Sequence, residues 1–147
     1  MSNDTTRIAF VCVQNAGRSQ MASAFAEHEC EARELTDSVE IVTGGTQPAE
    51  SVHDVVIEAM QEKGIDLSER TPREITHEDL QDCDYVITMG CSAEGVCPAS
   101  WSGENRDWDL DDPHGKDVEA VREIRNEIET RVTTLFDELS TDQRTGA

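Results

Sequence analysis

Lysine, aromatic residues and long apolar runs are scarce in this sequence. Its 147 residues include only two lysines, Lys63 and Lys116, and aromatic residues make up 4% of the chain. No apolar stretch is long enough to cross a bilayer, and the polar N-terminus lacks the apolar region of a signal peptide. We therefore expect a cytoplasmic protein that does not span a membrane.

Positive charge is scarce as well. Asp and Glu number 32 against 12 Lys and Arg, which gives a formal net charge of -20. Such a surface repels the phosphates of nucleic acids and anionic membranes, so we expect neither as a partner. An acidic excess with little lysine and few aromatic residues is typical of proteins from a salty cytoplasm, and an ordinary acidic cytosolic protein is the alternative. We favour the halophilic interpretation.

The five cysteines are an odd number and lack the regular spacing of a small secreted disulfide protein. They are Cys12, Cys30, Cys83, Cys91 and Cys97. In a reducing compartment, thiols grouped near a site more often do chemistry than hold structure, although we interpret Cys30 and Cys83 as structural. No CxxC pair accompanies the cysteines, so we expect no metal site. We interpret the four histidines as ordinary surface or packing residues; they are His28, His53, His77 and His114.

The segment 12–19 lies between a buried-type apolar run, residues 8–11, and a segment of helix-forming composition. In such a strand-to-helix loop, the backbone N–H groups and the helix N-terminus can hold a tetrahedral oxyanion. Arg18 can bind two oxygens of that anion with its planar guanidinium group. The same positive field favours the thiolate form of Cys12, which is the nucleophile, and Ser19 could donate a hydrogen bond to it.

This segment therefore predicts a nucleophile at the floor of an anion site. The predicted oxyanion-binding residues are Val13, Gln14, Asn15, Ala16, Gly17, Arg18 and Ser19. The alternative is a core cysteine at a strand end, with Arg18 a solvated residue of the first helical turn.

The rest of the chain alternates between strand and helix patterns. We expect strands over 8–11, 39–43 and 84–89, and helices over 19–33, 51–63, 76–81 and 116–139. This alternation predicts an α/β fold with a parallel sheet, in one domain over 1–147 whose ends, 1–6 and 140–147, fray. Ligands of such sheets bind beyond the carboxyl ends of the strands, where the loops near Cys12, Met89 and Pro113 would converge.

Two of these loops carry further candidates. Asp112 could protonate the oxygen that leaves the anion, and Pro113 confines its placement. A solvated charge is the alternative for Asp112, as for its acidic neighbours. Cys91 or Cys97 could attack the sulfur of Cys12, and the other could resolve the resulting disulfide by exchange. The alternative is two unpaired loop thiols.

Three stretches, residues 10–22, 86–91 and 108–113, together resemble arsenate reductases of the low-molecular-weight protein tyrosine phosphatase superfamily. The resemblance implies a single three-layer domain with a four-stranded parallel sheet flanked by helices. It also implies that Cys12 is the nucleophile and Asp112 the general acid, while the loop amides and the arginine bind the oxyanion. In that family, arsenate adds to the first thiolate, and a second cysteine then attacks, releasing arsenite and leaving a disulfide.

The resemblance also bears on the electron donor. By motif position, Cys91 is the second cysteine and Cys97 a third that presents the disulfide to thioredoxin. The thioredoxin-coupled pattern places its second cysteine where Gly90 stands, whereas the order Met89, Gly90, Cys91 is similar to members that use a low-molecular-weight thiol and a glutaredoxin-like protein. We therefore expect no tightly bound cofactor and an external thiol reductant of one of these two kinds.

Two other interpretations stay open. A protein tyrosine phosphatase would use the same loop for phosphotyrosine or aryl phosphates, with water attacking a phosphocysteine. That branch typically has aromatic residues after its Asp-Pro pair, whereas His114 and Gly115 follow here, which weakens the phosphatase interpretation. The two later cysteines, Cys91 and Cys97, favour the reductase. A non-catalytic anion-sensing or redox-sensing module would leave Asp112 without a role.

The acidic composition predicts that the domain loses structure at low ionic strength. In molar salt, where the Debye length is about 3 Å, repulsion among surface carboxylates is screened, and it grows as salt is removed. Circular dichroism should therefore show a loss of structure on dialysis from molar salt into dilute buffer. An unchanged spectrum would contradict the halophilic interpretation.

Overall fold

The computed structural model describes residues 5–89, 104–108, 110 and 115–145, with side chains as far as Leu139. Four strands form one sheet in the order β2-β1-β3-β4, and all three neighbouring pairs are parallel. In chain order, the elements are β1 (Thr6–Cys12), α1 (Arg18–Ala32), β2 (Val39–Gly45), α2 (Asp54–Gln61), α3 (His77–Gln81), β3 (Tyr85–Met89), β4 (Glu104–Asp107) and α5 (Val118–Thr145). The predicted α/β class and four-stranded parallel sheet are confirmed.

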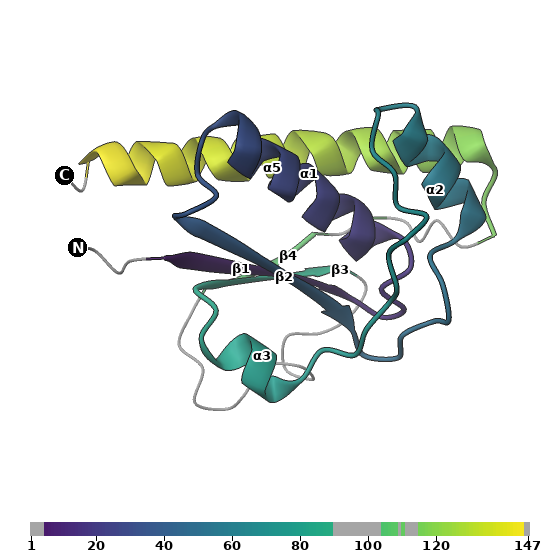
Figure 1. Ribbon diagram of the computed structural model, residues 1–147, viewed down its shortest axis with the longest axis horizontal. Helices are drawn as coiled ribbons and strands as arrows, with labels where there is room; N and C mark the ends of the chain where they lie inside the picture. Colours follow the sequence, from purple (N-terminus) through teal and green to yellow (C-terminus); the bar gives the residue numbers. More distant parts are fainter. Residues whose placement is uncertain (1–4, 90–103, 109, 111–114, 146–147) are drawn as a thin grey trace.

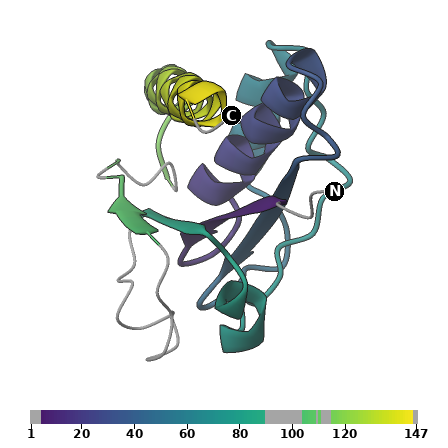
Figure 2. The ribbon, with the colours of Figure 1, turned by 90° about the vertical axis from the view of Figure 1, so that its left-hand side faces the viewer.

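The sheet lies between two unequal layers. Helices α1, α2 and α5 cover one face and the short helix α3 covers the other, as Figures 1 and 2 show from two directions. Strand β1 is buried on both faces: Ile8 and Phe10 pack in the core under the long helices, and Ala9 and Val11 pack in the core under α3. This alternation follows from the two-residue period of a strand, and burial of both faces explains why the run is apolar throughout.

The strand register brings the carboxyl ends of β1, β2 and β3 to one edge of the sheet. In the pairing with β2, Cys12 lies opposite Gly45, and in the pairing with β3 it lies opposite Met89. The loop that follows Cys12 therefore leaves the sheet beside the carboxyl end of β3, at the edge where ligands of such sheets bind.

Three elements differ from the sequence expectations. Strand β4 was not predicted from the local pattern, because its four residues are polar and charged, which suits an edge strand. Helix α2 begins at Asp54 rather than residue 51, since His53 is still extended (φ -62°, ψ 137°). The last helix was expected over 116–139, whereas α5 continues to Thr145, with no glycine or proline to interrupt it.

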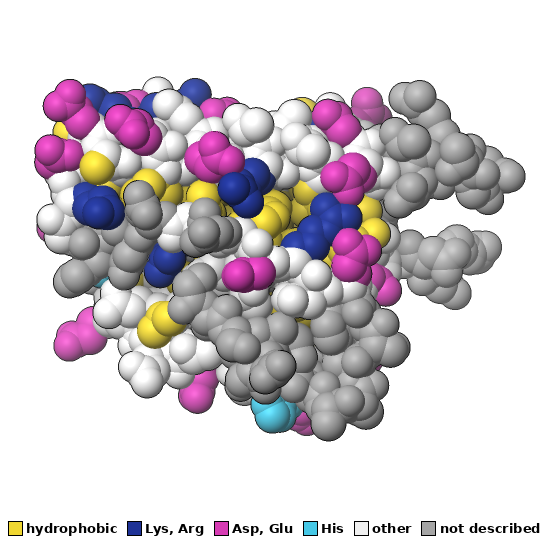
Figure 3. All heavy atoms as spheres, turned by 180° about the vertical axis from the view of Figure 1, so that it is seen from behind, with side chains coloured by type: hydrophobic (Ala, Val, Ile, Leu, Met, Phe, Trp, Pro, Cys, Tyr) yellow, Lys and Arg dark blue, Asp and Glu magenta, His cyan; other side chains and the backbone are white. Residues whose placement is uncertain are grey.

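Most arginines of the described surface are paired with carboxylates. Examples are Arg33 with Asp137 at 2.8 Å and Arg106 with Glu138 at 2.8 Å. The face in Figure 3 shows basic side chains lying beside acidic ones. Few positive charges are thus left to attract anions to the outer surface.

Helix α2 is joined to α5 through Glu62, which lies at the end of α2. Arg122 donates to both oxygens of Glu62, through Nε at 2.9 and 3.0 Å and Nη2 at 2.6 Å. Arg125 donates to Glu62 at 2.7 Å and to the carbonyl of Ala59 at 2.8 Å. The hydrogen bonds from Arg122, and then those from Arg125, lower the pKa of Glu62 to about 2.

The variant Glu62→Gln should weaken the acid sensitivity of the fold. Because the folded-state pKa of about 2 lies below the usual 4.5, the carboxylate stabilises the fold above pH 4.5 and loses this effect as the pH falls towards 2. Urea midpoints in molar salt between pH 7 and 3 should fall more steeply for the parent than for Glu62→Gln. The exposed Glu69→Gln should follow the parent. Equal slopes for the parent and Glu62→Gln would show that the pair makes no such contribution.

Candidate active site

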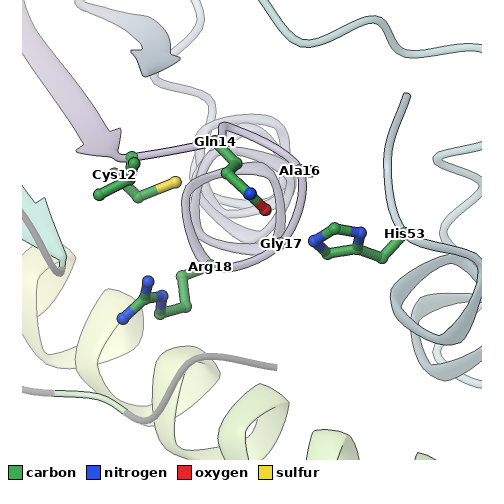
Figure 4. A pocket seen from close by; sticks show the side chains of 7 residues that line it. Cys12, Gln14, Ala16, Gly17, Arg18 and His53 are labelled. Carbon is green, nitrogen blue, oxygen red and sulfur yellow. The ribbon is translucent and has the colours of Figure 1, made fainter. Parts of the chain in front are cut away.

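The β1–α1 loop encloses a cavity of about 280 Å³ at the carboxyl edge of the sheet (Figure 4). Six of the seven residues that line it belong to the predicted oxyanion segment and its cysteine, and the seventh comes from the start of α2. They are Cys12, Val13, Gln14, Ala16, Gly17, Arg18 and His53. The sulfur of Cys12 points to the middle of this group in Figure 4, although the residue as a whole is only 3% exposed.

Two hydrogen-bonding groups converge on the sulfur of Cys12. The backbone N–H of Asn15 donates to it at 3.2 Å, and the hydroxyl of Ser19 lies 2.8 Å away. Both groups can act as hydrogen-bond donors to the sulfur of a nucleophilic cysteine. The predicted contact between Ser19 and Cys12 is therefore present.

Arg18 connects the loop to a distant part of the chain. Its side chain lines the cavity, and its guanidinium Nη1 donates to the carbonyl of Leu110 at 3.0 Å. Leu110 belongs to the acidic segment that was expected at this edge, so part of that segment does lie beside the loop. The predicted general acid Asp112 and the predicted redox cysteines Cys91 and Cys97 lie outside the described residues.

The side chain of Asn15 holds the loop in shape from the buried side. This residue is fully buried and has a left-handed backbone (φ 53°), which asparagine tolerates better than most residues. Its Nδ2 donates to Ser19 at 2.7 Å and to Thr43 at 3.0 Å. Its Oδ1 accepts from the side chain of Gln20 at 3.1 Å and from the backbone N–H of Arg73 at 3.0 Å.

The segment after β2 follows the loop closely and engages its carbonyl groups. The backbone N–H groups of residues 47, 49 and 53 donate to the carbonyls of Val13, Gln14 and Ala16 at 2.8 to 3.0 Å. At Gly45 a β-carbon would lie 2.5 Å from the carbonyl oxygen of Val13, so only glycine allows this approach. These hydrogen bonds pair three carbonyl groups of the loop with the segment after β2, and N–H groups of a strand-to-helix loop of this kind can bind an anion.

His53 is the residue of the cavity wall that sequence reasoning missed. It was interpreted as an ordinary surface or packing residue, because it lies far from the loop in sequence and belongs to no motif. Arg73 and Thr43 were missed as partners of Asn15 for the same reason. Only knowledge of how β2 pairs with β1 could have placed His53, Thr43 and Arg73 beside the loop.

The other described cysteines fit the structural role expected for them. Cys30 and Cys83 are both buried, and burial raises the pKa of each thiol to about 11. Thiols with such values stay protonated and react poorly as nucleophiles.

The described part of the chain holds no group of three or more His, Cys, Asp or Glu side chains placed to bind a metal ion. Within the same residues, no helix combines the length and apolar character that crossing a membrane requires.

Comparison with known proteins gives a consistent picture. The sequence model of the family "Low molecular weight phosphotyrosine protein phosphatase" matches residues 7–145. A protein of Halobacterium salinarum named "Putative arsenate reductase" is 58% identical over 146 residues, which cover 96% of this chain and 98% of that protein. A glutaredoxin arsenate reductase of Synechocystis is 34% identical, over 91% of this chain and 98% of that protein.

A solved structure is similar at the same level of identity. The thioredoxin-dependent arsenate reductase of Corynebacterium glutamicum superposes with a TM-score of 0.78 at 34% identity. The match covers 97% of this chain and 65% of that longer one.

Substitutions of Asn15 separate its hydrogen bonds from its backbone conformation. Asn15→Ala removes the side-chain hydrogen bonds and puts alanine, which tolerates positive φ less well than asparagine, at this position. The free energy of unfolding should therefore fall by about 2 to 4 kcal/mol. Asn15→Gly loses the same bonds but accepts the backbone, and should be less destabilised by about 1 kcal/mol. Urea unfolding in molar salt measures both, with the exposed Gln14→Ala as control. An Asn15→Ala variant as stable as the control would contradict the role given to this side chain.

Proposed function

We propose that this chain, which belongs to the low molecular weight phosphotyrosine protein phosphatase family, is an arsenate reductase that converts arsenate to arsenite. The proposal depends above all on the sulfur of Cys12, which lies between two hydrogen-bonding groups in a cavity that Arg18 also lines. The relatives from Halobacterium and Synechocystis, both named as arsenate reductases, support this substrate.

The first step uses the residues of the loop. Arsenate binds with its oxygens against the loop N–H groups and the guanidinium of Arg18. The thiolate of Cys12 attacks arsenic and forms an S–As bond, and one oxygen leaves as water after receiving a proton from Asp112. The hydrogen bonds to the Cys12 sulfur and the place of Arg18 in the wall of the same cavity support this step.

The second step is a thiol exchange. The thiolate of Cys91 attacks the sulfur of Cys12, forming a disulfide and breaking the S–As bond. The electron pair of that bond stays on arsenic, so As(V) becomes As(III) and arsenite leaves. Cys97 then takes over the disulfide, or an external thiol reduces it directly.

The reductant is an external thiol, either thioredoxin or a low-molecular-weight thiol with a glutaredoxin-like protein. Both kinds are represented among the relatives, one named a glutaredoxin arsenate reductase and the other thioredoxin-dependent. Glycine at position 90 favours the glutaredoxin type for this chain. The expected setting is a salty cytoplasm, and the relative from Halobacterium salinarum supports this.

Phosphatase activity is the second candidate, because the family takes its name from it. The same loop would bind the phosphoryl group of an aryl phosphate, and Cys12 would form a phosphocysteine that water hydrolyses. This reaction needs no second cysteine, so the two functions respond differently to substitution of Cys91.

The decisive experiment maps disulfides after exposure to arsenate. The reduced protein in molar salt is incubated with arsenate, quenched by alkylation and analysed by mass spectrometry. We expect an arsenate-dependent disulfide between Cys12 and Cys91, or between Cys91 and Cys97.

Variants assign the roles of the cysteines. Cys12→Ser should abolish all activity, since no nucleophile remains. Cys91→Ser should abolish arsenate reduction but spare hydrolysis of an aryl phosphate. Cys30→Ser, at a buried thiol outside the cavity, should keep both activities. Arsenate turnover at the parent rate by Cys91→Ser would refute the redox assignment.

A further inference from the structure

His53 belongs to the cavity wall but not to the loop that forms most of it. Its backbone N–H donates to the carbonyl of Ala16 at 3.0 Å, which ties the start of α2 to the loop. In Figure 4 its ring extends from the start of α2 toward Gln14 and Gly17, across the cavity from Cys12 and Arg18. The backbone of His53 is therefore fixed beside the loop, and its ring lies across the cavity from the sulfur of Cys12.

The position of His53 in α2 is one where another residue type would stabilise the helix better. It is the N-cap residue, where Asn, Asp, Ser or Thr accepts a hydrogen bond from the first turn, and its side chain makes no such bond. In the same chain, the N-cap of α3 is Thr76, which forms a complete capping box with Asp79. At the start of α2, the side chain lines the cavity instead of capping the helix.

The cavity is larger than a bare tetrahedral oxyanion requires. Its volume of about 280 Å³ equals that of roughly nine water molecules at about 30 Å³ each, whereas such an anion has five heavy atoms. An anion bound next to Cys12, with two oxygens on Arg18, has two further oxygens, of which one can contact the loop N–H groups and the other the opposite wall. His53 and Gln14 form that wall.

We propose that His53 is a further substrate-binding residue of this pocket, whose ring N–H donates a hydrogen bond to an oxygen of the bound oxyanion that Arg18 does not reach. The inference rests on the proposed function for the identity of the substrate, while the contact itself suits any tetrahedral oxyanion, phosphate included.

The variant His53→Asn tests the contact without harming the helix. Asparagine is a good N-cap residue, so α2 should be at least as stable, but its shorter side chain cannot reach across the cavity. Calorimetry in molar sodium chloride should show the Kd of inorganic phosphate rising about tenfold or more, as expected for loss of a hydrogen bond to a charged group. The KM for arsenate should rise by a similar factor, with kcat within about twofold of the parent.

The matched control is His77→Asn. His77 is an exposed residue in the first turn of α3, on the opposite face of the sheet, and its substitution should leave phosphate binding unchanged. A phosphate Kd for His53→Asn within twofold of the parent would overturn the inference. A parent protein that binds phosphate but does not reduce arsenate would instead refute the proposed function, and the phosphate comparison would still decide the role of His53.

Discussion

The hydrogen bonds of one buried amide, the side chain of Asn15, hold the site in shape. A short loop between a strand and a helix has to turn the chain while its N–H groups stay available to a ligand. Asn15 solves this by taking the left-handed conformation and bonding to Ser19 in α1, Thr43 in β2 and the backbone of Arg73. These partners come from three separate parts of the fold. The position of the loop therefore depends on how those parts pack together, and above all on the pairing of β1 with β2.

That packing also decides what surrounds the loop. Gly45 lies opposite Cys12 in the sheet, and its missing side chain lets the following segment run against the loop and engage its carbonyls. The same segment ends at His53, so the start of α2 is fixed relative to the cavity. The other end of α2 is fixed by Glu62 and the two arginines of α5. Helix α2, whose N-cap residue His53 lines the cavity, is thus fixed at both ends: at its start by the loop and at its end by α5.

The sequence predicts the local parts of this arrangement and misses the distant ones. The apolar run of β1, the loop after it and the apolar residues of α5 at helical spacing can each be recognised from a local pattern. The structure has all three. Strand β4 has no apolar alternation, because it lies at the sheet edge and is polar, so only the family resemblance implied it. His53 and Arg73 reach the loop through the pairing of β1 with β2 and the chain that follows it. No local pattern encodes that contact. Asp112, Cys91 and Cys97 stay predictions.

The acidic surface and the anion site are compatible because they act over different distances. In molar salt the Debye length is about 3 Å, so the net charge of -20 does not repel an oxyanion from the cavity. For the same reason, a basic surface would not attract the anion over a distance. Binding then depends on contacts shorter than this length, made by groups that are themselves buried. Arg18 is only 8% exposed, and the groups around the Cys12 sulfur are buried. A salt-adapted chain can therefore carry a strongly acidic surface and still bind an anion, provided that short, fixed hydrogen bonds supply the whole of the recognition.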